Sequence, residues 1–238
     1  MKKISLMTFI VLLSSFAYAE QNPLIFPNEK IRKLKLNIVD GNVKIISSSL
    51  APSVLFSKVK GDAFCKPEVK VDDNDLIVKV VGDKNGPCEI NFEIQVPENT
   101  ILVNKMGCGN LDILNVQGVI DFKLEKGNVR ITHAGKEVNG NTGHGNVKIE
   151  GPINNADIVS GAGNIDVILT NNPGKGEIEL KTKRGNVTVF APKESSIRTS
   201  AKVGTGFMTS EIPENPEATF KIMMRSGVGQ LRIKKSKP

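Results

Sequence analysis

The sequence predicts an all-β protein, a single-stranded β-solenoid of stacked two-strand rungs of about 18 to 23 residues each. Three observations predict this fold: a Gly-Asn phrase recurs, apolar and polar residues alternate after each copy, and no segment beyond the leader has a sustained helical period. The 238 residues include 22 Gly, 12 Pro and no Trp, a composition that favours many turns. The glycines follow no G-X-Y period and long Ala/Glu/Leu runs are missing, which argues against collagen and coiled coil.

The leader comes first in the chain. Lys2 and Lys3 precede an apolar run at 6–13, and Ala17-Tyr18-Ala19 forms a small-x-small cleavage site. We interpret residues 1–19 as a secretory signal peptide. The run is too short to span a bilayer, and no later stretch approaches the ~18 to 20 apolar residues that a span needs. We therefore expect a bacterial extracytoplasmic protein, periplasmic or secreted after cleavage near Ala19, with 30 basic and 25 acidic residues.

The segment after the leader is less regular than the rest. Alternating residues at 34–38, 54–59, 69–81 and 90–96 indicate strands without the Gly-Asn spacing. We interpret residues 20–105 as the irregular β N-terminal part of the solenoid, and residues 106–238 as its regular repeat. A separate small β domain ending near Pro97 is the alternative.

The exported part contains three cysteines, Cys65, Cys88 and Cys108, in a compartment where disulfides persist. An alternating run from Val69 to Val80 lies between the first two, which predicts a disulfide between Cys65 and Cys88 across the ends of a hairpin. The alternative is three buried thiols that act as small apolar side chains.

The repeat itself is Gly-Asn, an apolar residue, any residue and a second apolar residue. Four copies begin at a constant interval, at positions 109, 127, 145 and 163, and the next begins at 185 after a slightly longer one. Degenerate copies at Gly206 and Gly229 continue the series as successive corners. The structural repeat residues are Gly41, Asn42, Gly109, Asn110, Gly127, Asn128, Gly145, Asn146, Gly163, Asn164, Gly185 and Asn186.

Each unit holds two short strands, which bury their apolar faces only when copies stack at about 4.8 Å. Glycine supplies a turn conformation closed to residues with a Cβ, and asparagine tolerates left-handed geometry while bonding to nearby backbone. We therefore expect the asparagine row to be structural, with a ligand-binding row as the alternative.

The sequence predicts no catalytic residue, no cofactor and no metal site. The residue before each Gly-Asn pair varies in chemistry, and Cys108 and His144 in this column lie two rungs apart, too far to share one zinc ion. His133 falls in a turn. On the outward face, Asp112 and Asp166 lie three rungs apart, roughly 14 Å, which exceeds the separation of paired catalytic carboxylates.

Several segments resemble a known family. Val96-Pro97-Glu98-Asn99-Thr100, Leu102-Val103 and Val116-Gln117-Gly118 between Gly-Asn stations are similar to the bacterial β-strand-repeat family labelled putative adhesin, a domain of unknown function. The resemblance covers about residues 33–233. It implies an exported, repetitive all-β domain, and it supplies no catalytic residues.

The leading hypothesis is a non-enzymatic, exported, adhesin-like interaction or structural module of the cell envelope that uses the flat outer face of its rungs. Its partner is an unknown envelope protein or glycan; nucleic acid is not expected. The alternatives are a carbohydrate-active enzyme and an envelope sensor or assembly subunit. The basic tail at 232–237 is expected to blunt the open end of the stack, with weak binding to an anionic surface as its alternative role.

Overall fold

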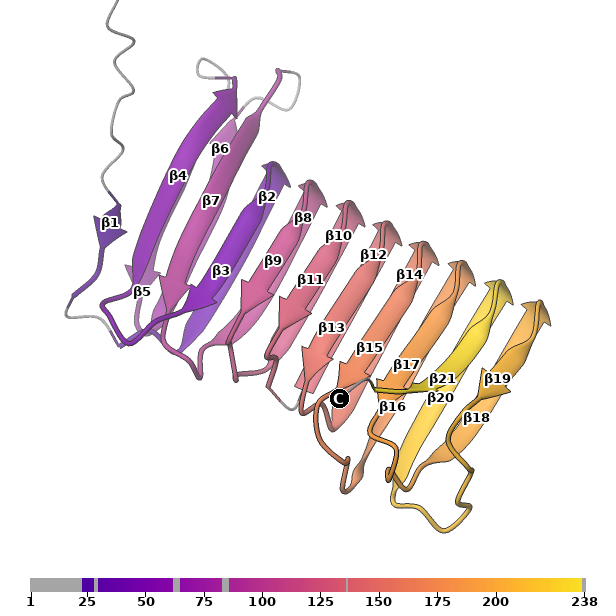
Figure 1. Ribbon diagram of the computed structural model, residues 1–238. Helices are drawn as coiled ribbons and strands as arrows, with labels where there is room; N and C mark the ends of the chain where they lie inside the picture. Colours follow the sequence, from indigo (N-terminus) through magenta and orange to yellow (C-terminus); the bar gives the residue numbers. More distant parts are fainter. Residues whose placement is uncertain (1–22, 28–29, 62–64, 83–85, 136, 237–238) are drawn as a thin grey trace, which may run out of the picture.

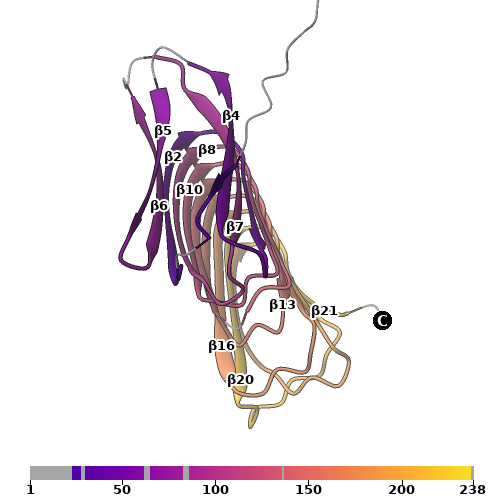
Figure 2. The same cartoon turned by 90° about the vertical axis from the view of Figure 1, so that its left-hand side faces the viewer.

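The computed structural model of the protein describes residues 23–27, 30–61, 65–82, 86–135 and 137–236 (Figure 1). Within these residues the regular structure is all β-strand, in two sheets that face each other as layers (Figure 2). Among the described strands, eleven form sheet A, in the order β1-β4-β7-β3-β9-β11-β13-β15-β17-β21-β19. Ten form sheet B, in the order β18-β20-β16-β14-β12-β10-β8-β2-β6-β5. The predicted signal peptide, residues 1–19, lies outside the described residues.

The chain alternates between the two sheets over most of its length. Sheet A contains β1 (Leu24–Ile25), β3 (Val43–Ser47), β4 (Ser53–Lys60), β7 (Glu89–Val96), β9 (Leu111–Leu114), β11 (Val129–Thr132), β13 (Val147–Gly151), β15 (Ile165–Leu169), β17 (Val187–Ala191), β19 (Met208–Ser210) and β21 (Leu231–Lys235). Sheet B contains β2 (Lys33–Asp40), β5 (Cys65–Asp72), β6 (Asp75–Gly82), β8 (Ile101–Cys108), β10 (Ile120–Lys126), β12 (Glu137–His144), β14 (Asn155–Ala162), β16 (Gly176–Arg184), β18 (Arg198–Thr205) and β20 (Phe220–Val228).

The repeat determines the strand register. Val129 pairs with Leu111 on one side and with Val147 on the other, each one repeat interval away in the sequence. The pairing is parallel throughout the repeat region, and antiparallel only where β1, β4 and β7 meet and in the β5–β6 hairpin, among the described strands. The result is the predicted all-β, solenoid-like stack, in which we call one sheet B strand and the sheet A strand after it a rung.

The core lies between the two sheets and is built from identical positions of successive rungs. The apolar residues of the repeat point inward, and in sheet A they form two buried columns. One column is Val43, Leu111, Val129, Val147, Ile165, Val187 and Leu231, and the other is Ile45, Ile113, Ile131, Ile149, Val167, Val189 and Ile233. Each fully buried side chain of this size contributes about 1.5–3 kcal/mol, and a rung buries these side chains only against its neighbours.

The glycine of each repeat occupies a corner that other residues cannot adopt. Gly145 has φ of +139°, and a Cβ at this position would overlap the carbonyl group of Gly127 in the neighbouring rung. Glycine is therefore required at this corner for two reasons: the positive φ and the close approach of the neighbouring backbone.

At the N-terminal end the order of strands departs from the order of the chain. β2 lies between β6 and β8, and β3 lies between β7 and β9, so the irregular segment continues both sheets. Asp73 and Asn74 form the turn of the β5–β6 hairpin. The predicted disulfide between Cys65 and Cys88 is confirmed, with 5.8 Å between the two Cα atoms, and it ties β5 to the chain just before β7.

The C-terminal end corrects one expectation. The rung of Gly229 (β20 and β21) does not follow that of Gly206 (β18 and β19) in the stack; it lies between β16–β17 and β18–β19. The inward side chains give the physical reason. Ile222 and Met224 of β20 are fully buried, whereas Ala201 of β18 is exposed at the matching position. The more apolar rung takes the interior place, where it is covered on both sides.

The same order corrects the expected role of the basic tail. Residues 231–235 form β21, which pairs with β17 on one side and β19 on the other, so this segment does not end the stack. The open edge of sheet B is β18, which carries Arg198 and Lys202, both exposed. Charged side chains on an edge strand discourage further strand pairing, so these two residues take the role expected of the tail.

Candidate functional site

The outer face of sheet B carries two adjacent rows of side chains that run across the strands. Because side chains alternate along a strand, residues two apart point to the same face, and parallel register aligns them from rung to rung. The row that we call the basic row is Lys79, Asn37, Lys105, Lys123, Asn141, Val159, Lys181, Arg225 and Lys202. The mixed row beside it is Ile77, Lys35, Val103, Asp121, Asn139, Asp157, Glu179, Met223 and Ser200.

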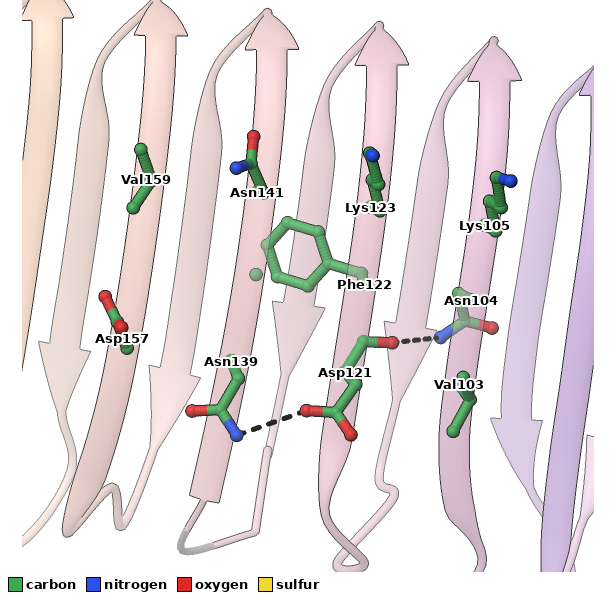
Figure 3. Close-up of a pocket in the computed structure, with 11 residues that line it drawn as sticks. Val103, Asn104, Lys105, Asp121, Phe122, Lys123, Asn139, Asn141, Asp157 and Val159 are labelled. Atoms are coloured by element: carbon green, nitrogen blue, oxygen red, sulfur yellow. Dashed lines mark hydrogen bonds between the residues drawn. The ribbon is translucent and has the colours of Figure 1, made fainter.

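A groove of about 460 Å³ lies between these rows where they cross β8, β10, β12 and β14 (Figure 3). Its two sides are members of the rows: Val103, Asp121, Asn139 and Asp157 on one side, and Lys105, Lys123, Asn141 and Val159 on the other. The groove is open to solvent along its length, which suits an elongated ligand rather than a small enclosed one.

The floor of the groove is formed by the column of inward residues between the two rows. Gly140 lacks a side chain, and the ring of Phe122 from the neighbouring strand occupies the space beneath it. Asn104 is buried in the same column and donates from Nδ2 to the backbone carbonyl of Asp121 at 3.4 Å. Its Oδ1 has no hydrogen-bond partner among the described residues.

The charged side chains on the two sides of the groove differ in whether they have a partner. Asp121 accepts a hydrogen bond from Nδ2 of Asn139 at 3.1 Å, so this carboxylate is already engaged. Lys105 and Lys123 are exposed and take part in no ion pair among the described residues. The groove therefore offers two adjacent ammonium groups to solvent.

Elsewhere on this face the charged groups pair with each other. Nζ of Lys181 lies 2.9 Å from Glu179, which is also 3.9 Å from the guanidinium of Arg225. Near the other end, Lys79 donates to Glu68 at 2.8 Å, and this hydrogen bond lowers the pKa of the Glu68 carboxyl.

A second ion pair at the same end involves Lys35, which lies 2.7 Å from Asp75. The hydrogen bond to this carboxylate raises the pKa of the Lys35 ammonium. The end of sheet B near β5 and β6 is thus held by paired charges, and its lysines are less available than those of the groove.

On its other side the basic row borders a strip that is mostly glycine. This glycine strip is Val81, Val39, Gly107, Glu125, Gly143, Gly161, Lys183, Gly227 and Gly204, two residues after each basic-row position. A Cβ at Gly161 would overlap the carbonyl of Gly143 in the next rung, so the backbones approach too closely for a side chain there. Bare backbone beside the row leaves its long side chains accessible from that side.

The predicted repeat residues lie at one corner, away from the groove. The asparagines form a ladder in which the backbone N–H of each donates to Oδ1 of the asparagine before it; Asn146 donates to Asn128 at 2.9 Å and Asn164 to Asn146 at 2.9 Å. The ladder begins at Asn91, which accepts from the N–H of Asn42, and ends at Gln230, which donates to Asn186. Oδ1 of each of these asparagines is thus engaged by the backbone of the neighbouring rung.

Asn91 was missed in the sequence because Ile90 replaces the glycine before it. Its signal was present in weaker form: Asn91 is followed by an apolar residue, Glu93 and a second apolar residue, as in the repeat. A search for asparagine, an apolar residue, any residue and a second apolar residue, without the preceding glycine, would identify Asn91 as the first member of the ladder.

The residues considered for metal binding are separated. Lys126 lies between Cys108 and His144 in the register, so these two are two strands apart. His133 lies in a turn, where Nδ1 is 2.8 Å from Oδ1 of Asn115. Among the described residues, no group of three or more His, Cys, Asp or Glu side chains is arranged to hold a metal ion.

The acids considered for catalysis lie on the outer face of sheet A. Arg130 and Lys148 separate Asp112 from Asp166 in the register, so the two carboxylates are three strands apart. No helix among the described residues is long and apolar enough to cross a membrane.

No family model and no curated protein matches the chain. Among solved structures, one described as a putative adhesin from Bacteroides fragilis matches 90% of this chain and 97% of its own, at 17% identity and a TM-score of 0.50. A putative cell adhesion protein from Clostridium sporogenes has a TM-score of 0.45 at 16% identity, covering 91% and 99%. A putative adhesin from Parabacteroides merdae has a TM-score of 0.28 at 11% identity, covering 92% and 98%. At these identities, the first match shows that the fold is shared.

Proposed function

We propose that the protein is a non-enzymatic, exported, adhesin-like interaction module of the bacterial cell envelope that binds its partner through the outer face of sheet B. The observation that carries this proposal is the groove with two exposed lysines, Lys105 and Lys123, that pair with no acid among the described residues, on a long and regular face. The description of the Bacteroides fragilis protein as a putative adhesin agrees with it.

Export is supported by two independent features. The segment 1–19 has the composition of a signal peptide, and the Cys65–Cys88 disulfide belongs in an oxidising compartment. The proposed organisation is a signal peptide at 1–19, an irregular β part at 20–105 and rungs of about 18 to 23 residues at 106–238. The Gly-Asn spacing supports membership of the β-strand-repeat family.

The experiment is a crosslinking pull-down of the exported protein from intact cells, comparing the wild type with Asn141→Glu in the groove and Lys148→Glu on sheet A. Both positions are exposed and belong to the same rung, so the substitutions test the face rather than the fold. Recovery of one glycan or protein that is lost with Asn141→Glu and kept with Lys148→Glu supports the proposal. Equal loss with both variants, or turnover of envelope polysaccharide by the protein, contradicts it.

A second candidate, an assembly subunit, is favoured by the open end of the stack. Phe207 and Met208, at the start of the edge strand of sheet A, are 50% and 38% exposed. In an assembly this end stacks on another protein. Light scattering that shows concentration-dependent oligomers, abolished by Met208→Asp, supports this role; a monomer at all concentrations rejects it.

A further inference from the structure

We propose that the basic row binds a linear acidic polysaccharide laid across the strands of sheet B, along the axis of the stack. This inference rests on the proposed function and specifies the ligand class of the same face. The sequence suggested the basic tail as the part that binds an anionic surface. We assign this binding to the basic row instead, because Lys234 and Lys235 belong to the interior strand β21.

The charge of the basic row has one sign. Six of its nine positions are Lys or Arg and none is acidic. The corresponding row on sheet A contains both signs instead: Glu93, Lys44, Asp112, Arg130, Lys148, Asp166, Thr188 and Arg232. An anionic chain along the sheet B row therefore meets no acidic side chain within that row, whereas one along the sheet A row meets both signs.

The spacing of the row matches a repeating ligand. Adjacent strands are about 4.8 Å apart, so the nine strands of the row extend over about 38 Å. Lys105 and Lys123 are on adjacent strands, and Lys181, Arg225 and Lys202 are on three adjacent strands. A polymer with acid groups at multiples of this spacing meets both clusters at once, and a monosaccharide meets only one.

The row is accessible for such a chain. Lys105, Lys123, Arg225 and Lys202 are exposed, and glycines flank most of the row on the side away from the mixed row. Glu125 is the nearest acid on that side, two residues after Lys123 on the same face of β10. Four basic side chains of the row, on β8, β10, β20 and β18, are therefore open to solvent.

The remaining chemistry of the face favours a polysaccharide over a nucleic acid. The basic and mixed rows contain no aromatic side chain on which bases would stack, since Phe122 lies under the surface. They contain amides instead: Asn37 and Asn141 supply donors and acceptors that suit sugar hydroxyl groups, and Asn139, whose Nδ2 donates to Asp121 and Glu137, adds an acceptor.

The test measures binding of the purified mature protein to polygalacturonate, with dextran as the neutral polysaccharide and oligo-dT as the nucleic acid. The variant is Lys105→Gln with Lys123→Gln. Its matched control is Arg130→Gln with Lys148→Gln, which removes the same charge from exposed side chains on adjacent strands of sheet A. Identical thermal unfolding of all three proteins shows that each is folded.

Binding to polygalacturonate but not to dextran is expected, weakened about tenfold in the sheet B variant and about unchanged in the control. Longer oligomers should bind more tightly, and added salt should weaken binding. Equal weakening in both variants, or oligo-dT bound as tightly as polygalacturonate, overturns the proposal. If polygalacturonate does not bind while the cell pull-down is still abolished by Asn141→Glu, the ligand class is wrong and the proposed function stands.

Discussion

The ring of Phe122 lies directly beneath Gly140 in the next strand, so a Cβ at Gly140 would overlap the ring atoms Cζ and Cε1. These two residues are neighbours in one inward column, and the missing side chain of one accommodates the large side chain of the other. Their fit closes the core under the groove, between the strands that carry Lys123 and Asn141.

Gly140→Ala should therefore destabilise the protein by about 1–3 kcal/mol through overpacking. In a Phe122→Leu background the same substitution should cost less, because the smaller side chain leaves room for the methyl group. Urea unfolding of the four proteins in the cycle measures this coupling, which we expect at about 0.5–3 kcal/mol. An equal cost in both backgrounds would show that the two residues do not share the space.

The corner glycines should be intolerant of substitution. Gly145→Ala places a Cβ against the Gly127 carbonyl at a φ of +139°, and the backbone strain alone costs about 1–3 kcal/mol. Gly174→Ala is the control, because Gly174 is exposed with no atom near its Cβ position, and it should change stability by less than about 0.5 kcal/mol. Thermal unfolding compares the two, and similar losses would argue against a steric role for the corner.

Removing a hydrogen-bond acceptor from the asparagine ladder should destabilise the protein. Asn146→Leu removes the acceptor for the N–H of Asn164, at a cost of about 0.5–1.5 kcal/mol. Asn146→Asp keeps an acceptor oxygen at the same position and should lose less. Chemical denaturation distinguishes them; if the two variants are equally destabilised, the bond to Asn164 is not the source of the loss.

The disulfide should stabilise the N-terminal end of the stack. It links residues 23 apart, and closing a loop of this length stabilises the folded state by about 3 kcal/mol in the chain-entropy model. Cys88→Ala should lower the melting temperature, and reduction of the wild type should lower it similarly. Cys108→Ala removes an unbridged thiol and serves as the control. An unchanged melting temperature on complete reduction is the contrary result.

The pair Glu68 and Lys79 predicts a pH dependence. Because the hydrogen bond from Lys79 lowers the pKa of Glu68 in the folded state, the carboxylate contributes stability above its unfolded pKa of about 4.3. That contribution is lost as the pH falls through the lower, folded pKa. NMR titration should show the Glu68 pKa rising in Lys79→Met and rising less in Lys66→Met, whose charge has a smaller effect. A larger rise of the Glu68 pKa in Lys66→Met than in Lys79→Met would show that Lys66, not Lys79, is the main cause of the lowered pKa.

The repeat made the stack and its glycine corners predictable, because the same phrase recurs at a constant interval and a two-strand unit cannot bury its core alone. The disulfide followed from alternation between Cys65 and Cys88. The exchanged order of the last two rungs could not be predicted from the Gly-Asn repeat. It depends on how apolar the inward residues are, such as Ala201 compared with Met224.

The basic row was also hidden in the sequence. Lys105 and Lys123 are one repeat interval apart, but Lys181 and Arg225 are separated by more than two intervals, and Lys202 follows Arg225 in the stack although it precedes it in the chain. Only the strand register aligns them. The charges of the lysine-rich tail are contiguous in the sequence, but consecutive residues of a strand point to opposite faces of the sheet, so contiguous charges do not share one face.

Site-specific photocrosslinking in intact cells tests the central claim, that the outer face of sheet B is the binding face, most directly. A photoreactive amino acid is placed at position 141 or at position 148, two exposed positions on opposite sheets of one rung. We expect a discrete crosslinked product from position 141 and none from position 148. A product from position 148 alone, or equal products from both, would contradict it.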